Sequence, residues 1–568
     1  MSHLLALSVG PVQEFIAAAR RTRDLWFGSY LLSEISKAVA QSVSEQGGTL
    51  IFPHPETDLT PSKEEVNVAN IVLAELPGGD PAAVADRAKQ AARGRWRQFA
   101  DETYQEACRV IRKEIWDEQV DDVIEFYAAW TRQTGHYADD RQKLMRLLAG
   151  RKNCRDFVAA KGHTGVPKSS LDGQRESVLI DPKRQKWPAR FRARWRIREG
   201  EQLDAVGLVK RVAEGNRPYP SVSRIAADPW LRGNADRLAD LKRHCEDLAH
   251  RGLLRRLDTG LWPHFQTFPY EGTAVYPFRH HELIDETEST LQELQPLRRA
   301  LARLPEAQPY LAVLVADGDS MGKAISNLPD AAANRHFSRM LSGFADEARK
   351  IVADHRGVLV YAGGDDVLAF LPLDQCLPCA RKLHDDFGSR LREFGQPTLS
   401  VGIAIGHFIE NLEDLLDYAR AAEKHAKRVK NKDALAVHLH KRSGAPIEVA
   451  ARWVDRPDES LTLYADLIRT EALPSKLPYD LHKLVEIYRA PGWDNDNTRR
   501  DALQKDALRV IADKQPRAGR QHMPTVRRVI GGIASASELQ RFCEELLVAR
   551  QLAVARQQAG LPATQPLL

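Results

Sequence analysis

The fold is decided by the stretch VLVYAGGDDVLAFL, residues 358–371. Two apolar runs flank the glycine-containing segment AGGDD at 362–366, an arrangement typical of a β-hairpin. Upstream, YLAVLVA at 310–316 predicts a buried strand that leads into the turn DGDSMGK at 317–323. Helices are predicted at 330–355, 374–394 and 412–429, and strands at 397–405 and 434–439. This order, β-α-β-β-α-β followed by α-β, predicts a ferredoxin-like sheet with an appended unit.

The N-terminal part of the chain repeats this order of elements. A strand at 4–9 ends at Gly10, and a helix with a break near Gly28 follows at 12–45. Strands at 49–52 and 70–76 and a helix at 81–112 complete the series. We therefore predict a duplicated fold in which only the second copy carries clustered aspartates. Two unrelated α+β units are the alternative interpretation.

Length and pattern together predict an α+β protein of several domains, because 568 residues correspond to three or four domains of ordinary size. Residues 151–300 have a mixed, mostly helical pattern, and residues 446–568 show helical periodicity with little strand signal. The predicted domains are a first ferredoxin-like domain, a mixed helical domain, a second ferredoxin-like domain and a helical bundle. Their predicted bounds are 1–150, 151–300, 301–445 and 446–568.

Composition excludes several classes of protein. Hydrophobic residues make up 43% and charged residues 28%, which is ordinary for a globular chain and unlike a disordered one. The longest apolar runs are far shorter than the 18 or so residues of a membrane span, and the first 15 residues do not resemble a signal peptide. Six cysteines in so long a chain make no disulfide framework. We expect a cytoplasmic protein without membrane partners, and the net charge of +5 permits a nucleic-acid partner.

The candidate catalytic residues are aspartates at two predicted turns. Asp365 and Asp366 lie at the hairpin tip, and Asp317 and Asp319 follow the strand expected beside it. Clustered carboxylates repel one another unless cations neutralise them, and oxygen ligands suit Mg²⁺ or Mn²⁺. Two such ions a few ångströms apart are the arrangement used for nucleotidyl transfer. Taken singly, each of the two motifs is more often a plain surface turn.

Two further features could bind a phosphate group. The turn from Gly318 to Gly322 opens a predicted helix, whose free amides could bind a triphosphate tail. Lys427, near the end of a later helix, could neutralise the same tail as a point charge.

At this point the sequence resembles known families. The strand-turn-strand around AGGDD resembles the GGDEF and nucleotide-cyclase/polymerase palm superfamily, and Lys427 with Asn431 resembles the lysine-bearing motif of that domain. Three other stretches point to a more specific family: SVGPVQEFIAAAR at 8–20, DLWFGS at 24–29 and PKSSLDG at 167–173. They resemble the large polymerase-like subunit of type III-B CRISPR–Cas effector (Cmr) complexes.

The resemblance implies two palm domains and assigns roles to residues. By position, Asp317, Asp365 and Asp366 would hold two Mg²⁺ or Mn²⁺ ions and act in catalysis. Gly10 would face a second ATP from the degenerate first palm. The remaining residues implied to line the nucleotide site are Gly318, Asp319, Ser320, Gly363, Gly364 and Lys427.

The implied function is a nucleotidyltransferase activated by target RNA. Such subunits act with the other subunits of a Cmr-type ribonucleoprotein complex, with guide CRISPR RNA and with complementary target RNA. They convert ATP into cyclic oligoadenylates through 3′–5′ linkages. Transfer of AMP to S-adenosylmethionine, a non-catalytic RNA-binding scaffold and a free-standing cyclase are the alternatives, of which the last fits the large N-terminal half poorly.

The sequence departs from the family pattern in two places. The first predicted palm strand begins almost at once, and the only His-Asp pair, His384-Asp385, lies in a predicted palm helix. We therefore expect no HD nuclease. Cys376 and Cys379 form a lone CxxC with no second pair nearby, so no structural zinc is expected and residues 151–300 lack the zinc cysteines.

A run of arginines is a candidate RNA contact. Arg192, Arg194, Arg196 and Arg198 alternate with Ala193, Trp195 and Ile197, which predicts a strand with one cationic and one apolar face. Such a face could contact RNA phosphates. The alternative is a solvated outer face of an edge strand.

Overall fold

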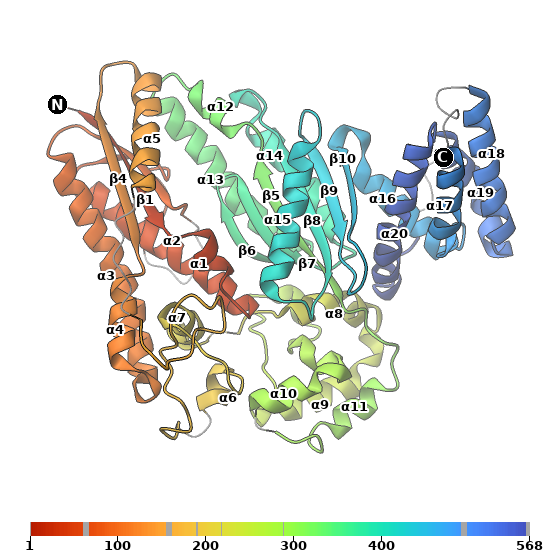
Figure 1. Cartoon of the computed structure of the whole chain (residues 1–568), viewed down its shortest axis with the longest axis horizontal. Coiled ribbons are helices and arrows are strands. Elements are labelled where there is room, and N and C mark those ends of the chain that lie inside the picture. Colours follow the sequence, from red (N-terminus) through yellow and green to blue (C-terminus); the bar gives the residue numbers. More distant parts are fainter. Residues whose placement is uncertain are drawn as a thin grey trace.

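The computed structural model describes residues 2–60, 68–154, 162–188, 191–216, 218–287, 289–489 and 497–563. Two separate β-sheets lie side by side, with helices below them and a group of helices at one end (Figure 1). No helix of the described residues is long and apolar enough to cross a membrane.

The first sheet has the order β2-β3-β1-β4 and is antiparallel throughout. Its strands are β1 (His3–Gly10), β2 (Thr49–Phe52), β3 (Ile71–Leu76) and β4 (Glu125–Arg132). Its helices are α1 (Gln13–Ala17), α2 (Thr22–Glu45), α3 (Pro81–Ala107), α4 (Lys113–Asp121) and α5 (Tyr137–Asn153). Successive side chains of β1 point to opposite faces of the sheet. Leu5 and Leu7 pack in a core with α2 and α3 on one face, and Leu4 and Ala6 pack in a core with α5 on the other.

The second sheet has the order β10-β9-β8-β5-β7-β6. Its strands are β5 (Tyr310–Gly318), β6 (Val358–Gly363), β7 (Asp366–Leu371), β8 (Leu399–His407), β9 (Ala434–Leu439) and β10 (Ile447–Arg452). Its helices are α12 (Met321–Ser326), α13 (Ala331–Asp354), α14 (Cys376–Arg390) and α15 (Leu412–Arg428). In both sheets the four core strands have the same neighbour order, first strand between third and fourth, so the predicted α+β fold with two ferredoxin-like sheets is confirmed.

The two faces of the second sheet have different neighbours. Helices α13 and α14 pack with Ala312 and Leu314 of β5 on one face. Residues Leu311 and Val313 of the same strand share a core with α15 and with α2 of the N-terminal part. The second sheet is therefore buried between its own helices and the rest of the chain.

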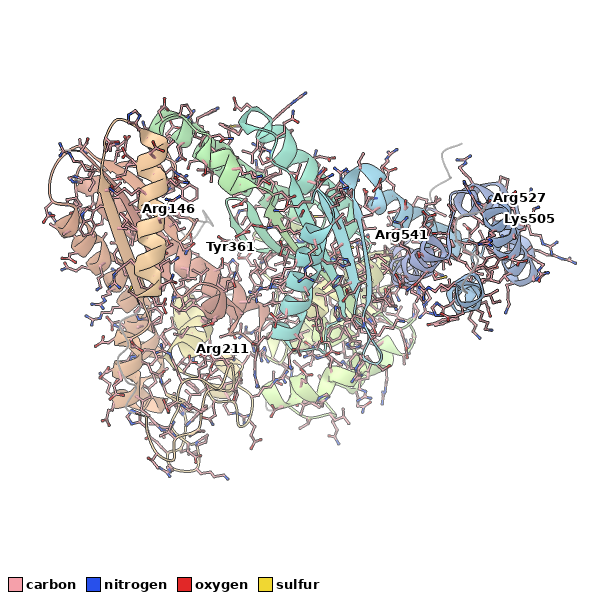
Figure 2. All side chains as sticks on the ribbon, turned by 45° about the horizontal axis from the view of Figure 1, so that its top comes forward. Arg146, Arg211, Tyr361, Lys505, Arg527 and Arg541 are labelled. Carbon is pink, nitrogen blue, oxygen red and sulfur yellow. The ribbon has the colours of Figure 1, made fainter. Side chains whose placement is uncertain are left out.

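The region between the sheets contains short helices: α6 (Phe191–Trp195), α7 (Ala205–Val212), α8 (Val222–Gly233), α9 (Ala239–His250), α10 (His280–Thr287) and α11 (Gln295–Leu301). It is attached to the first sheet by a fully buried charge cluster. Arg211 of α7 (labelled in Figure 2) donates to Asp24 of α2 at 2.7 Å and to Glu201 at 3.2 Å. All three side chains are at most 3% exposed.

The C-terminal helices are α16 (Pro457–Arg469), α17 (Leu477–Tyr488), α18 (Asn497–Lys514), α19 (Met523–Gly531) and α20 (Ala536–Gln558). The first half of α20 packs within this group, through residues such as Leu539 and Leu546. Its second half, with Val548 and Leu552, belongs to the core of the second sheet. Helix α20 thus joins the C-terminal helices to that sheet.

Three sequence-based expectations about the sheets and the first long helix differ from the structure. Residues 447–452, predicted as helix, form strand β10, which pairs antiparallel with β9. Strand β4 was not expected, and it completes the first sheet. The break in the first long helix falls at 18–21, between α1 and α2, and Gly28 lies inside α2.

The arginine run is not a strand. Residues 191–195 form helix α6, because Phe191 and Trp195, four residues apart, are both buried and define a helical face. Arg192 pairs with Asp285 at 3.3 Å, and Arg194 pairs with Glu106 at 2.9 Å. Arg196 is only 5% exposed. The predicted strand with one continuous cationic face is therefore wrong, whereas a contact of Arg192, Arg194 and Arg196 with RNA stays a prediction.

Candidate functional site

Two strands bring the candidate metal ligands together. Strand β5 pairs with β7 up to Ala316 and Val367, which places Asp317 beside the start of β7. The β6–β7 hairpin closes with Gly363 opposite Asp366, leaving Gly364 and Asp365 as the turn.

As a result, Asp317, Asp365 and Asp366 each offer an oxygen atom, and these atoms lie within 4.8 Å of one another. The aspartate group, as we call these three residues, is thus assembled from segments about fifty residues apart.

Close packing at this corner explains the glycines. A Cβ atom on Gly363 would lie 1.6 Å from the hydroxyl of Tyr361, and one on Gly318 would lie 2.9 Å from Cβ of Asp365. Gly364 has φ of +83°, which L-residues with side chains rarely adopt. The glycines therefore allow the tip of the hairpin to approach the end of β5.

Burial and mutual repulsion shift the protonation of the aspartate group. The pKa of Asp365 is raised to about 7 by burial and by the charge of Asp366, and burial raises the pKa of Asp366 to about 6. Tyr361, on β6 at the centre of the molecule (Figure 2), has a raised pKa because of burial and the same two carboxylates. The site thus holds more negative charge than it can readily keep, which is the condition that favours bound cations.

Lys427 already supplies one positive charge. Its ammonium group forms an ion pair with Asp317 and contacts Glu423 Oε1 at 3.1 Å. Burial lowers the pKa of Lys427 to about 8. Lys427 therefore lies at the candidate site, as expected. The expected partner was a triphosphate tail, whereas in this structure the lysine pairs with Asp317 of the aspartate group.

Asp319 differs from the expectation. The carboxylate is 3% exposed, and its Oδ2 accepts hydrogen bonds from Thr398 at 2.9 Å and Ser400 at 2.8 Å. The backbone N–H of Asp433 also donates to Oδ2, at 3.2 Å. The physical reason is the backbone: Asp319 lies just beyond the end of β5, and its N–H donates to Thr398 O at 2.7 Å, which holds it beside the start of β8. Asp319 thus joins β5 to β8 and to the loop before β9, outside the aspartate group.

The other expected residues are placed as follows. Ser320 precedes the short helix α12, and the amide of residue 319 already donates to Thr398 O. Gly10 ends β1 opposite Glu125 of β4, so its contact with a second nucleotide stays a prediction. His384 lies on α14, where its ring contacts Asp385 at 3.0 Å and Asp433 at 2.8 Å.

Sequence reasoning missed two residues of the site. Tyr361 is two positions before Gly363 on β6, and Glu423 is four positions before Lys427 on α15. Glu423 could have been predicted from the sequence, because residues four positions apart on a helix are neighbours and it lies four positions before Lys427. Nothing in the local sequence marks Tyr361, whose role depends on the fold of the hairpin.

The fold and the site together define a protein with two palm-type sheets, of which the second carries a carboxylate cluster suited to hard divalent cations. Residues 310–436 match the family model for the second palm domain of Cas10/Cmr2, and residues 4–101 match that for the N-terminal region of the CRISPR-associated protein Cmr2. These matches confirm the resemblance to Cmr2-type proteins that the sequence motifs indicated.

Individual relatives agree with the family models. The chain is 25% identical to the CRISPR system Cmr subunit Cmr2 of Pyrococcus furiosus, with 78% of this chain and 62% of that protein covered. The chain thus spans less than two thirds of the length of this curated relative.

Two solved structures have a similar fold. They are chains of the type III-B Cmr-beta complex in its apo state (TM-score 0.66) and bound to cognate target RNA (TM-score 0.63). Each is 14% identical, covers 91% of this chain, and is itself covered to 77% and 79% respectively.

Proposed function

We propose that the second-sheet site is a two-metal nucleotidyltransferase that joins ATP molecules into cyclic oligoadenylates, within a Cmr-type complex activated by target RNA. The observation that carries the proposal is the aspartate group itself. Three carboxylates from two strands converge within 4.8 Å, and the pKa values of two of them are raised.

The donor set fits the implied ions. All three side chains offer oxygen ligands, and Mg²⁺ and Mn²⁺ prefer oxygen. When bound, such ions would activate a ribose hydroxyl and stabilise charge on the leaving pyrophosphate. Asp317, Asp365 and Asp366 would hold them.

The protein's own residues would hold and orient the substrate. With Asp317 engaged by cations, the ammonium group of Lys427 would be free to pair with the phosphates of ATP. Glu423, 3.1 Å from the ammonium, then keeps the lysine beside the site. Gly364 has open space where a Cβ atom would stand, so the backbone of the turn is accessible to close approach by a nucleotide.

The partners of this chain are part of the proposal. The Cmr2-type relatives are named as subunits of Cmr complexes, and one of the similar structures has cognate target RNA bound. We infer that this chain binds other Cmr-type subunits and acts when a guide CRISPR RNA is paired with its target. The domain bounds predicted from the sequence and the expected absence of an HD nuclease stay predictions.

The test uses the chain reconstituted with the subunits and guide RNA of its own complex. ATP with Mg²⁺ or Mn²⁺ should give cyclic oligoadenylates when target RNA is present and almost none without it. Asp365→Asn with Asp366→Asn should lower synthesis by several orders of magnitude while assembly and RNA binding persist. A matched control is Asp385→Asn with Asp386→Asn, an adjacent pair on α14 that should leave synthesis unchanged.

Product analysis separates the alternatives. Reactions with and without S-adenosylmethionine distinguish an oligoadenylate from an AMP adduct of that acceptor. A complex that binds target RNA but forms no product from ATP under either condition would make the chain a scaffold. Equal turnover by the isolated chain and the RNA-bound complex would contradict activation by target RNA.

A further inference from the structure

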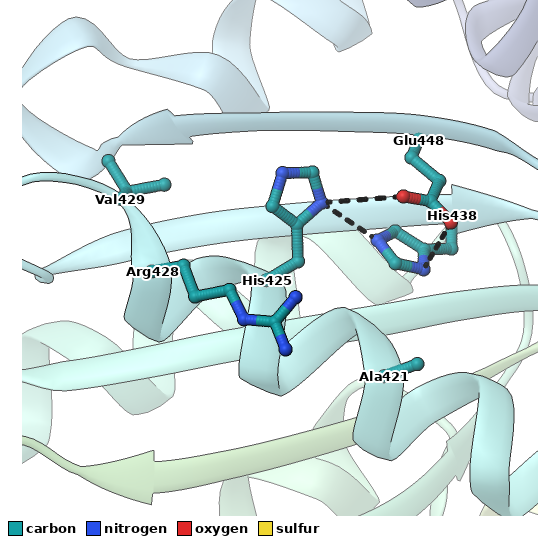
Figure 3. A pocket seen from close by; sticks show the side chains of 6 residues that line it. All are labelled: Ala421, His425, Arg428, Val429, His438 and Glu448. Atoms are coloured by element: carbon teal, nitrogen blue, oxygen red, sulfur yellow. Dashed lines mark hydrogen bonds and ion pairs between the residues drawn. The ribbon is translucent and has the colours of Figure 1, made fainter.

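A second cluster of metal-ligand side chains lies apart from the aspartate group, between α15, β9 and β10. It contains His425 of α15, His438 of β9 and Glu448 of β10. His438 and Glu448 are direct cross-strand partners, so their side chains leave the same face of the sheet. Helix α15 lies across that face and adds His425 (Figure 3).

The three side chains point toward one another (Figure 3). Nδ1 of His425 lies 3.0 Å from Nε2 of His438 and 4.0 Å from Oε2 of Glu448. One possible ligand atom from each residue lies within 4.8 Å of the other two. In a tetrahedral zinc site the ligand atoms are about 3.4 Å apart, because zinc–ligand distances are about 2.0–2.2 Å. A small rotation of the half-exposed Glu448 would bring its carboxylate to that separation.

Without an ion, His438 is hydrogen-bonded through Nε2 to Nδ1 of His425, but its other ring nitrogen lacks a partner. His438 is 2% exposed, and its Nδ1 is buried without a hydrogen-bond partner, 3.8 Å from Glu448 Oε1. An unsatisfied buried polar atom costs about 1–3 kcal/mol and calls for an explanation.

The surroundings leave access for an ion and a further ligand. The cluster lines an open pocket of about 480 Å³ together with Ala421, Arg428 and Val429. Three protein ligands and one open position are a usual zinc arrangement. Arg428, which also lines the pocket (Figure 3), would favour water or a small anion in the open position.

We propose that His425, His438 and Glu448 form a binding site for Zn²⁺ or a similar divalent transition metal, which fastens α15 to the β9–β10 hairpin. The ligands are two imidazoles and one carboxylate, a set that suits zinc and differs from the oxygen-only aspartate group. The expectation of no structural zinc concerned cysteine spacing and did not consider these residues. The proposal does not depend on the proposed nucleotidyltransferase activity.

The site has a mechanical consequence for the same helix. Lys427 is two residues after His425 on α15, which places the two side chains on different sides of the helix. An ion at the cluster would hold the C-terminal turn of α15 and therefore the backbone that carries Lys427.

The test measures metal binding by the full chain in an Asp365→Asn, Asp366→Asn background, which removes most of the competing carboxylate ligands. After treatment with a chelator, equilibrium dialysis against Zn²⁺ should show one tightly bound equivalent, and Co²⁺ should give the visible absorption of a tetrahedral site. Zn²⁺ should also raise the thermal midpoint, because it binds the folded state.

Two variants identify the ligands without opening the core. His425→Gln and Glu448→Gln change partly exposed side chains and should each weaken Zn²⁺ binding at least about 100-fold, with loss of the Co²⁺ absorption. His482→Gln, an exposed histidine on α17, is the matched control and should change neither. Absence of tight Zn²⁺ binding by the parent chain, or binding that survives both variants, would overturn the proposal.

Discussion

The protonation of Asp365 gives a quantitative prediction about stability. In the metal-free protein its pKa is raised from 3.8 to about 7 by burial and by Asp366. The unfolded chain loses this proton near pH 4, whereas the folded chain keeps it until about pH 7. Stability must therefore fall as pH rises between these values, and the loss is complete above pH 7.

The size of the effect follows from the same shift. A rise from 3.8 to about 7 corresponds to about 4 kcal/mol, at about 1.4 kcal/mol for each pH unit. Asp365 is partly exposed, so solvent screening reduces this to roughly 2 kcal/mol. Asp365→Asn keeps the shape and removes the titration. Part of this loss already occurs below pH 5, so relative to the parent chain this variant should be about 1 kcal/mol more stable at pH 8 than it is at pH 5.

The assay is urea unfolding of both chains at pH 5 and pH 8, with a chelator to remove divalent cations. Asp346→Asn, at an exposed position of α13, is the control and should show no such pH-dependent gain. A stability difference between Asp365→Asn and the parent that is the same at both pH values would refute the reasoning. Millimolar Mn²⁺ should reverse the ranking at pH 8, because the parent chain then binds the cation.

Three further substitutions have clear expected outcomes. Lys427→Met should raise the KM for ATP about tenfold without weakening Mn²⁺ binding in a nucleotide-free titration, because the lysine competes with cations for its aspartate. Gly363→Ala should lower the free energy of unfolding, measured in urea, by about 1–3 kcal/mol, because its Cβ would overlap a tyrosine hydroxyl. Gly388→Ala, at a helix position with open space, is the control and should be neutral or stabilising. Arg211→Met should cost about 3–5 kcal/mol, because two buried carboxylates lose their partner, while Arg243→Met, in an exposed pair, should cost less than about 1 kcal/mol.

The second sheet could be predicted because its signals are local. Its order of elements could be predicted from apolar runs of strand length, glycines at turns and helices with a clear period. The order of elements in turn predicted which strands are neighbours. From that alone Asp317 was expected beside Asp365 and Asp366, and the structure brings the three together. The ion pair of Lys427 with Asp317 could not be predicted from the sequence, because Asp317 lies 110 residues earlier in the chain.

The misassigned segments share a different cause. Residues 192–198 alternate in charge, which suggests a strand, but burial of Phe191 and Trp195 selects a helix. Residues 447–452 are too short a segment for periodicity to separate a strand from the start of a helix, and their conformation depends on pairing with β9. Asp319 resembles Asp317 in sequence, yet it lies just beyond β5 and its carboxylate is held by Thr398 and Ser400, contacts that the local sequence does not show.

The position of α20 sets the order in which the molecule can be completed during synthesis. Val548 and Leu552 complete the core of a sheet whose last strand ends at Arg452, so about one hundred residues must be translated before that core can close. At 5–20 residues per second, this delay is about 5–20 s on the ribosome. During that time the edge strand β10 and the apolar surface beneath it are exposed. The nascent chain is therefore expected to depend on chaperones most strongly while its C-terminal helices are being made.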